Sequence, residues 1–174
     1  YYASRGLGDV YKRQCPGVMA QTGIETLDIV RGICEKIDAD AVIAVDALAA
    51  RSSKRLNTTI QITDTGISPG SGVGNNRKTL SAANLGRRVI ALGVPTVISV
   101  PSIIDDSLDE VADVFNEAYG RKIMREFTEG QRYQIARSLI DEDMADMFVT
   151  PKNIDELVKR ISYTISEAIN SLTL

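Results

Sequence analysis

The run AVIAV at residues 41–45 constrains the fold of this chain more than any other feature. Five consecutive apolar residues, most of them β-branched, are typical of a strand that is buried on both faces of a sheet. A helical pattern precedes this run, because residues 26–37 place apolar side chains at one-turn spacing: Leu27, Val30, Ile33, Cys34 and Ile37. A helix that leads directly into a buried strand favours a layered α/β domain.

The rest of the chain continues this alternation. Residues 58–64 (TTIQITD) alternate apolar and polar side chains, which predicts a more exposed strand. Residues 89–100 (VIALGVPTVISV) are apolar but contain Gly93 and Pro95, which predict a short parallel strand, a bend and a second extended piece. Residues 108–119 predict a helix, and Thr150-Pro151-Lys152 predicts the start of the last helix. We therefore predict an α/β fold with a central, mainly parallel or mixed sheet that is flanked by helices.

The composition limits the chemistry. The chain has no histidine, which excludes Ser-His-Asp and Cys-His catalysis within one chain and the usual zinc sites. Cys15 and Cys34 lack the spacing of a metal or redox pair, so we expect two free thiols in a reduced, cytoplasmic setting. A net charge of −3 without a long basic run gives no case for direct nucleic-acid or membrane-surface binding. No apolar stretch reaches the ~20 residues that span a bilayer.

Residues 1–14 (YYASRGLGDVYKRQ) do not read like the start of a domain. They lack apolar periodicity, and they resemble translated sequencing-adapter DNA. We predict that residues 1–14 are non-native and that residues 15–174 form a partial α/β domain with a helical C-terminal part. The glycines of the GLGD string follow no predicted strand, so Asp9 receives no functional role.

Asp46 is the first candidate for acid–base chemistry. It follows the apolar run, at the predicted end of a strand, and ligand sites of open α/β sheets gather at the carboxyl ends of strands. Partial desolvation there would raise the pKa of the carboxyl group and suit it to proton transfer. The alternative is that Asp46 caps the turn ALAAR that follows, and the pattern alone leaves both interpretations open.

Asp64 is the second candidate, because Asp64-Thr65-Gly66 matches the catalytic triplet of pepsin-like and retroviral proteases. That chemistry needs a β-barrel and a second such triplet, whereas this chain alternates helices with strands and has no second copy. We favour the interpretation that Asp64 ends a strand and starts a turn.

The loop PGSGVGNNRK at residues 69–78 offers a third possibility. It lacks the spacing of a phosphate-binding P-loop, so its glycines Gly70, Gly72 and Gly74 are expected to allow a close approach to a neighbour or substrate. A nucleotide-binding domain remains an alternative. Four cationic residues add positive charge near this region: Arg51, Arg55, Arg77 and Lys78. They could attract an acidic substrate, but the default interpretation is that they are ordinary solvated surface residues.

Four blocks of the sequence, taken in order, resemble the spore germination protease family. They are PGVMAQTGIET, VIAVDALAARSSKRLNTTIQITDTGISPGSGVGNNRK, VIALGVPTVISV and MFVTPKNIDELVKRIS, and the resemblance covers Pro16 to Leu174. It implies a fold related to the hydrogenase-maturation endopeptidases. It also implies an endopeptidase that degrades small acid-soluble spore proteins during germination, in the spore-core cytoplasm, and that is made as a zymogen and assembles as a homotetramer.

The same resemblance implies an unusual aspartic mechanism with two catalytic aspartates, one of which maps onto Asp46. The other belongs to an upstream GLGN…TPD segment that this sequence lacks, so we expect this chain to be inactive alone. We expect no cofactor and no bound metal, although oxygen ligands holding a hard cation remain an alternative. A non-catalytic binding or assembly module of the same fold is the other alternative.

Overall fold

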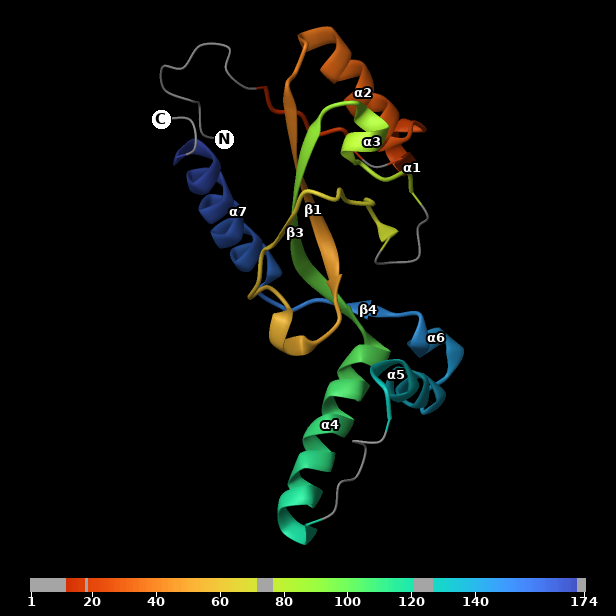
Figure 1. Cartoon of the computed structure of the whole chain (residues 1–174). Helices are drawn as coiled ribbons and strands as arrows, with labels where there is room; N and C mark the ends of the chain where they lie inside the picture. Colours follow the sequence, from red (N-terminus) through yellow and green to blue (C-terminus); the bar gives the residue numbers. More distant parts are fainter. Residues whose placement is uncertain (1–11, 18, 72–76, 121–126, 172–174) are drawn as a thin grey trace.

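A computed structural model gives the structure of the chain, and residues 12–17, 19–71, 77–120 and 127–171 are described. The fold is α/β, with a mixed four-stranded sheet flanked by helices, as predicted (Figure 1). Residues 12–17 form neither helix nor strand, and most of the predicted non-native segment lies outside the described residues. The elements are α1 (Met19–Thr22), α2 (Thr26–Ile37), β1 (Ala41–Ala50), the 3₁₀ helix η1 (Ser53–Arg55), β2 (Gln61–Thr63), α3 (Ala82–Leu85), β3 (Arg88–Ser99), α4 (Val100–Tyr119), α5 (Glu129–Ser138), α6 (Glu142–Ala145), β4 (Phe148–Val149) and α7 (Ile154–Ser171).

Strand β3 lies in the middle of the sheet. β1 runs parallel to it, whereas β2 and β4 run antiparallel to it. β1 pairs with β3 along its whole length, from Ala41 opposite Arg88 to Ala50 opposite Ile98. Within the described part of the chain, β1 is therefore an edge strand.

The core lies on the face of the sheet that α2 and α3 cover. Leu27 of α2, Leu85 of α3 and Val89 of β3 are all buried and form one cluster with Leu80. The helix at residues 26–37 has the predicted bounds because its apolar stripe packs into this cluster. Figure 1 shows α2 and α3 on one side of β1 and β3, with α7 on the other side.

The prediction for β1 was wrong in two respects. The strand continues through Ala50 instead of ending after its apolar first half, because the small residues after Asp46 go on pairing with β3. Nor is the strand buried on both faces, since Ile43 is 42% exposed and Val45 is 53% exposed. Only the side chains that point toward α2 and α3 are covered, which produces an alternating exposure along the strand.

Strand β3 is one continuous strand, and the predicted break at Gly93 and Pro95 is absent from it. Its register against β1 shifts by one residue after the pair Leu48 and Pro95, so Thr96 is left without a partner in β1. This bulge accommodates the irregularity without ending the strand.

The last helix begins at Ile154, later than its predicted start at residues 150–152. The hydroxyl of Thr150 does not cap the helix but donates to the backbone oxygen of Thr96, at 2.8 Å. Residues 150–153 therefore connect β4 to α7, and the chain is tied to β3 at the bulge.

Helix α4 begins directly after β3, eight residues before the predicted helix at residues 108–119. The hydroxyl oxygen of Ser99 caps it by accepting from the backbone N–H of Ser102, at 3.2 Å. Figure 1 shows α4 extending away from the sheet, with α5 beside it. None of the helices in the described ranges has the length and apolar character that crossing a membrane requires.

Candidate active site around Asp46

Asp46 lies in the middle of β1, opposite Gly93 of β3. The structure therefore contradicts both sequence-based interpretations of its position, as a strand end and as a helix cap. The four residues that follow it continue the strand, so its backbone conformation is set by pairing with β3 and not by a turn.

The side chain of Asp46 projects from the same face of β1 as Val42 and Ala44, which pack against the core cluster. Its partner Gly93 has no side chain, and Leu48 fills that space: a Cβ added to Gly93 would lie 2.3 Å from Leu48 Cδ1. Apolar groups therefore adjoin the carboxyl group along its own strand.

The electrostatic environment of Asp46 follows from this position. Its Oδ2 atom is buried and has no hydrogen-bond partner among the described residues. Desolvation raises the pKa of the Asp46 carboxyl above its ordinary value, because burial penalises the charged form. The backbone amides of Ala47 and Gly70 oppose this rise in the pKa of Asp46. A carboxyl group with a raised pKa accepts a proton more readily than an exposed one, which suits it to acid–base chemistry.

Asp64 does not take part in this arrangement. It is exposed and lies in a bend directly after β2, which confirms the interpretation as a strand end and turn. The local hydrogen bond in that bend is made by the hydroxyl oxygen of Thr63, which accepts from the backbone N–H of Thr65 at 3.1 Å.

Of the glycine loop, Gly70 is described, and its backbone amide is one of the groups that lower the pKa of Asp46. Gly72 and Gly74 lie outside the described residues. Most of the loop on which the nucleotide-binding alternative depends is therefore not described. The neighbouring cations do not converge on one place: Arg77 pairs with Glu25, Lys78 pairs with Asp28, and Arg51 pairs with Glu129.

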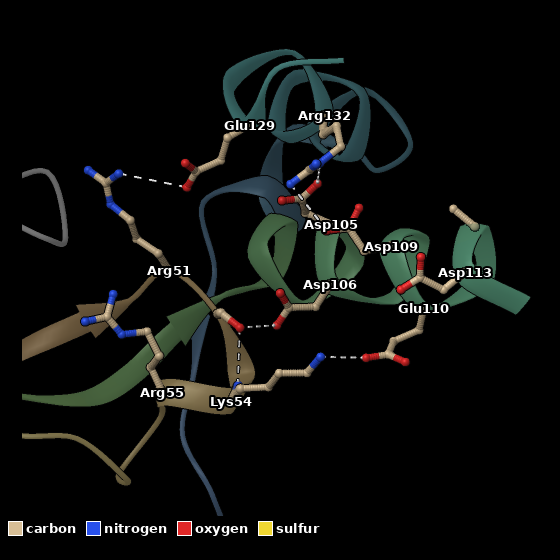
Figure 2. A pocket seen from close by; sticks show the side chains of 12 residues that line it. Arg51, Lys54, Arg55, Asp105, Asp106, Asp109, Glu110, Asp113, Glu129 and Arg132 are labelled. Atoms are coloured by element: carbon tan, nitrogen blue, oxygen red, sulfur yellow. Dashed lines mark hydrogen bonds and ion pairs between the residues drawn. The ribbon is translucent and has the colours of Figure 1, made fainter. Parts of the chain in front are cut away.

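A cavity of about 600 Å³ opens where β1 ends and α4 begins (Figure 2). This is the carboxyl end of the two parallel strands, where α/β proteins commonly bind ligands. Asp46 is not part of it. The lining is almost entirely charged: Arg51, Ser52, Lys54, Arg55, Asp105, Asp106, Asp109, Glu110, Ala112, Asp113, Glu129 and Arg132.

Ion pairs connect the charged groups of this cavity. Arg132 of α5 lies 3.6 Å from Asp105 and 3.3 Å from Asp109, both on α4, and Lys54 lies 2.8 Å from Glu110. Desolvation raises the pKa of Asp105, and the charge of Arg132 opposes that rise. No group of three potential metal ligands occurs within the ranges that the structure describes. We interpret the network as the contact that joins α5 and η1 to α4.

Sequence reasoning missed this network, although one local signal was present. Asp105, Asp109 and Asp113 recur at four-residue spacing, which places three carboxylates on one face of a helix. The pairing with Arg132, by contrast, depends on how α5 folds back onto α4.

Residues 4–147 match the family model described as germination protease. The chain is 43% identical over 160 residues to a germination protease of Clostridium perfringens, covering 89% of this chain and 49% of the relative. It is 41% identical to one from Caldanaerobacter subterraneus, with the same coverage. It is 40% identical to one from Bacillus cereus, covering 90% of this chain and 52% of the relative. The chain thus spans about half the length of the curated relatives it matches.

Proposed function

Because the chain belongs to the germination protease family, we propose that it forms part of a peptidase that acts when spores germinate. One observation carries the assignment of the chemistry to a residue. Asp46 lies within the family match and is a carboxyl group with one buried, unpartnered oxygen and a raised pKa. Asp105 also has a raised pKa, but Arg132 pairs with it, whereas no charged side chain is among the causes of the shift at Asp46. Among the described residues, Asp46 therefore has the environment best suited to proton transfer.

The proposed mechanism is hydrolysis of a peptide bond assisted by two carboxyl groups. One takes a proton from water, which attacks the carbonyl carbon, and the other gives a proton to the departing amine. Asp46 is one of the two. Desolvation and two backbone amides account for its pKa shift in the described residues, with no charged side chain among the causes. We therefore assign the second acid to the part of the family's length that this chain does not span.

The resemblance in sequence supports further parts of the proposal. The substrates are small acid-soluble spore proteins, the compartment is the cytoplasm of the spore core, and the active form is a processed homotetramer. The reaction as proposed uses no cofactor.

A chimera tests the proposal. The matched half of the Clostridium perfringens relative is replaced by this chain, and cleavage of small acid-soluble spore proteins is measured. We expect Asp46→Asn to lower kcat by about 10²–10⁴-fold, the contribution typical of a positioned acid or base. Asp64→Asn is the matched control, because it makes the same chemical change at an exposed position, and it should retain activity.

Two results would contradict the assignment. Full activity of the Asp46→Asn chimera would remove Asp46 from the mechanism. If the chimera that retains Asp46 is folded and assembled but binds the spore proteins without cleaving them, the alternative of a non-catalytic binding module would be favoured. A loss of activity on treatment with a chelator would support the alternative of a hard cation held by oxygen ligands.

A further inference from the structure

Strand β1 has a long edge with which no other strand of the described chain pairs. Its ten residues, Ala41–Ala50, pair with β3 on one side only. The backbone N–H and C=O groups of alternate residues in a strand point to opposite sides, so an edge strand presents a row of unpaired groups. Among the described residues, no backbone hydrogen bond outside the ladder with β3 involves residues 41–50. The outward-pointing groups of β1 are therefore available to a further strand.

The sequence of β1 carries none of the features that usually protect an edge strand. Natural edges are commonly short, or contain lysine, proline or a bulge of their own. β1 is ten residues long, has neither lysine nor proline, and has Asp46 as its one charged residue. By contrast, β2 is three residues long and β4 is two residues long. The length and composition of β1 are those of an internal strand.

The exposure of β1 leads to the same conclusion. A continuous apolar run such as AVIAV is typical of a strand covered on both faces, yet Ile43 and Val45 are exposed. Even Val42 and Ala44, which pack against the core, are only partly buried. A strand beside β1 would bring side chains to within ~5 Å of these residues on both faces of the sheet. A neighbour at the free edge would therefore reduce the exposure of both sets of side chains.

We propose that a strand from the part of the family's length that this chain does not span pairs with the free edge of β1 and makes it an internal strand of the complete protein. The match leaves about half of each relative outside it, since it covers 49% of the Clostridium perfringens protein and 52% of the Bacillus cereus protein. In the relatives this added length belongs to the same polypeptide, which gives its strands a high effective concentration at the edge. A second copy of this chain is the competing occupant and would have to be recruited from solution.

Hydrogen exchange tests the pairing in the chimera in which this chain replaces the matched half of the Clostridium perfringens relative. In the isolated chain, we expect alternate amides of residues 41–50 to exchange fast and the amides between them to exchange slowly, because only the slow set is bonded to β3. In the chimera, we expect the fast set to slow to the rates of the other set. The slow set is the internal control, because a general gain in stability would act on that set as well.

Proline variants test the same edge at single positions. Ala44 and Val45 are neighbours in β1, so the N–H of one points to β3 and the N–H of the other points to the free edge. Proline at the position that faces β3 should lower Tm in both proteins, because it removes a hydrogen bond of the ladder. Proline at the outward position should lower Tm more in the chimera than in the isolated chain, because only the chimera has a hydrogen bond to lose there. Val45→Ala in both proteins accounts for the loss of the valine side chain.

The outcomes decide between the occupants. Fast exchange of alternate β1 amides in the folded chimera would overturn the proposal, as would an equal loss of Tm from the outward proline in both proteins. Protection in the chimera that disappears on dilution would assign the edge to a second copy instead. If the chimera does not fold, the intact Clostridium perfringens relative replaces it, and its residues aligned with β1 should all be protected.

The pairing does not depend on the catalytic role of Asp46, and neither experiment measures cleavage. If Asp46→Asn leaves cleavage intact while β1 is protected on both edges, the proposed function is wrong and the pairing stands. If Asp46→Asn abolishes cleavage while the outer edge of β1 stays unprotected, the pairing is wrong and the proposed function stands.

Discussion

Burial of the Asp46 carboxyl group lowers the stability of the fold at the pH values where the group is ionised. Native-state burial of one carboxylate oxygen raises the pKa of the group above its ordinary value of 3.8. Between that value and the raised one, the native state binds more protons than the unfolded state. The free energy of unfolding therefore falls as the pH rises through this window, and it stays lower above it. Natural active sites commonly carry such a cost.

We therefore predict that Asp46→Asn stabilises the fold at pH 7, because the amide has nearly the same shape and no charge to desolvate. At a pH below 3.8, where Asp46 is protonated in both states, the gain should largely disappear. Thermal unfolding at both pH values measures this, and for a chain of this length each 1 kcal/mol corresponds to about 2–4 °C in Tm. The exposed Asp64→Asn should change Tm at neither pH, and an equal gain in both variants would contradict the argument.

The close packing of Leu48 against Gly93, next to Asp46, leads to a separate prediction about stability. An added Cβ would lie 2.3 Å from Leu48 Cδ1 and 2.9 Å from Leu48 Cγ, so Leu48 must move in Gly93→Ala. We expect a destabilisation of about 1–3 kcal/mol from overpacking. In Leu48→Ala the obstructing atoms are absent, so adding Gly93→Ala to that variant should cost much less. A double-mutant cycle in denaturant measures the coupling, and strict additivity of the two changes would refute it.

Among the secondary-structure elements, those fixed by local spacing could be predicted. Helix α2 has the predicted bounds because its apolar stripe at one-turn spacing is a property of residues 26–37 alone. The end of β1 could not be predicted. Whether residues 47–50 continue the strand depends on their pairing with β3, which includes a bulge at Thr96. The predicted start of α7 was wrong for a similar reason, because the hydroxyl of Thr150 donates a hydrogen bond to Thr96 of β3 instead of capping the helix.

In the candidate site too, local features could be predicted from the sequence and features that depend on distant residues could not. Asp46 could be singled out from the sequence, because a lone carboxylate in an apolar run is a local signal. That Asp46 lies in the middle of a strand could not, since the continuation of β1 beyond Asp46 depends on its pairing with β3. The charged cavity was missed because Asp105 and Arg132 come from separate helices.

The contact between α4 and α5 leads to a prediction with a pH dependence. Arg132→Met leaves Asp105, which is buried, without its ion-pair partner at 3.6 Å. We expect a loss of about 1–3 kcal/mol at pH 7, the cost of an unsatisfied buried polar group. Because Arg132 lowers the pKa of Asp105, its removal raises that pKa further, and the native state then binds more protons. The loss should therefore shrink as the pH falls and Asp105 becomes protonated.

Urea unfolding at pH 7 and pH 4 measures the effect, with Asp105→Asn combined with Arg132→Met as the matched variant. Its neutral amide needs no cation, so its stability relative to wild type should change less between the two pH values. A loss in Arg132→Met that is the same at both pH values would show that packing, and not charge, is what Arg132 contributes.

For the whole molecule, the two faces of the sheet differ in how completely they are covered. Val45, Leu92 and Ile62 are paired across β1, β3 and β2, so their side chains form one row on the face opposite α2 and α3. Val45 is 53% exposed and Ile62 is 70% exposed, although α7 lies on that side of the sheet (Figure 1). Helix α7 therefore covers this apolar face only in part. Contiguous exposed apolar surface of this kind tends to associate with other apolar groups.

This face should accordingly be detectable in solution as a binding surface for apolar dyes. We predict that the pair of changes Val45→Thr and Ile62→Thr lowers the fluorescence of bound anilinonaphthalene sulfonate and reduces concentration-dependent association in sedimentation experiments. Threonine keeps the β-branched shape that suits a strand, so Tm should change little. Val111→Thr combined with Val114→Thr is the matched control, because it removes two similarly exposed valines from α4, away from the sheet. If the control lowers dye binding as much as the sheet variant does, the exposed surface of α4, and not the open face of the sheet, dominates the apolar surface of the chain.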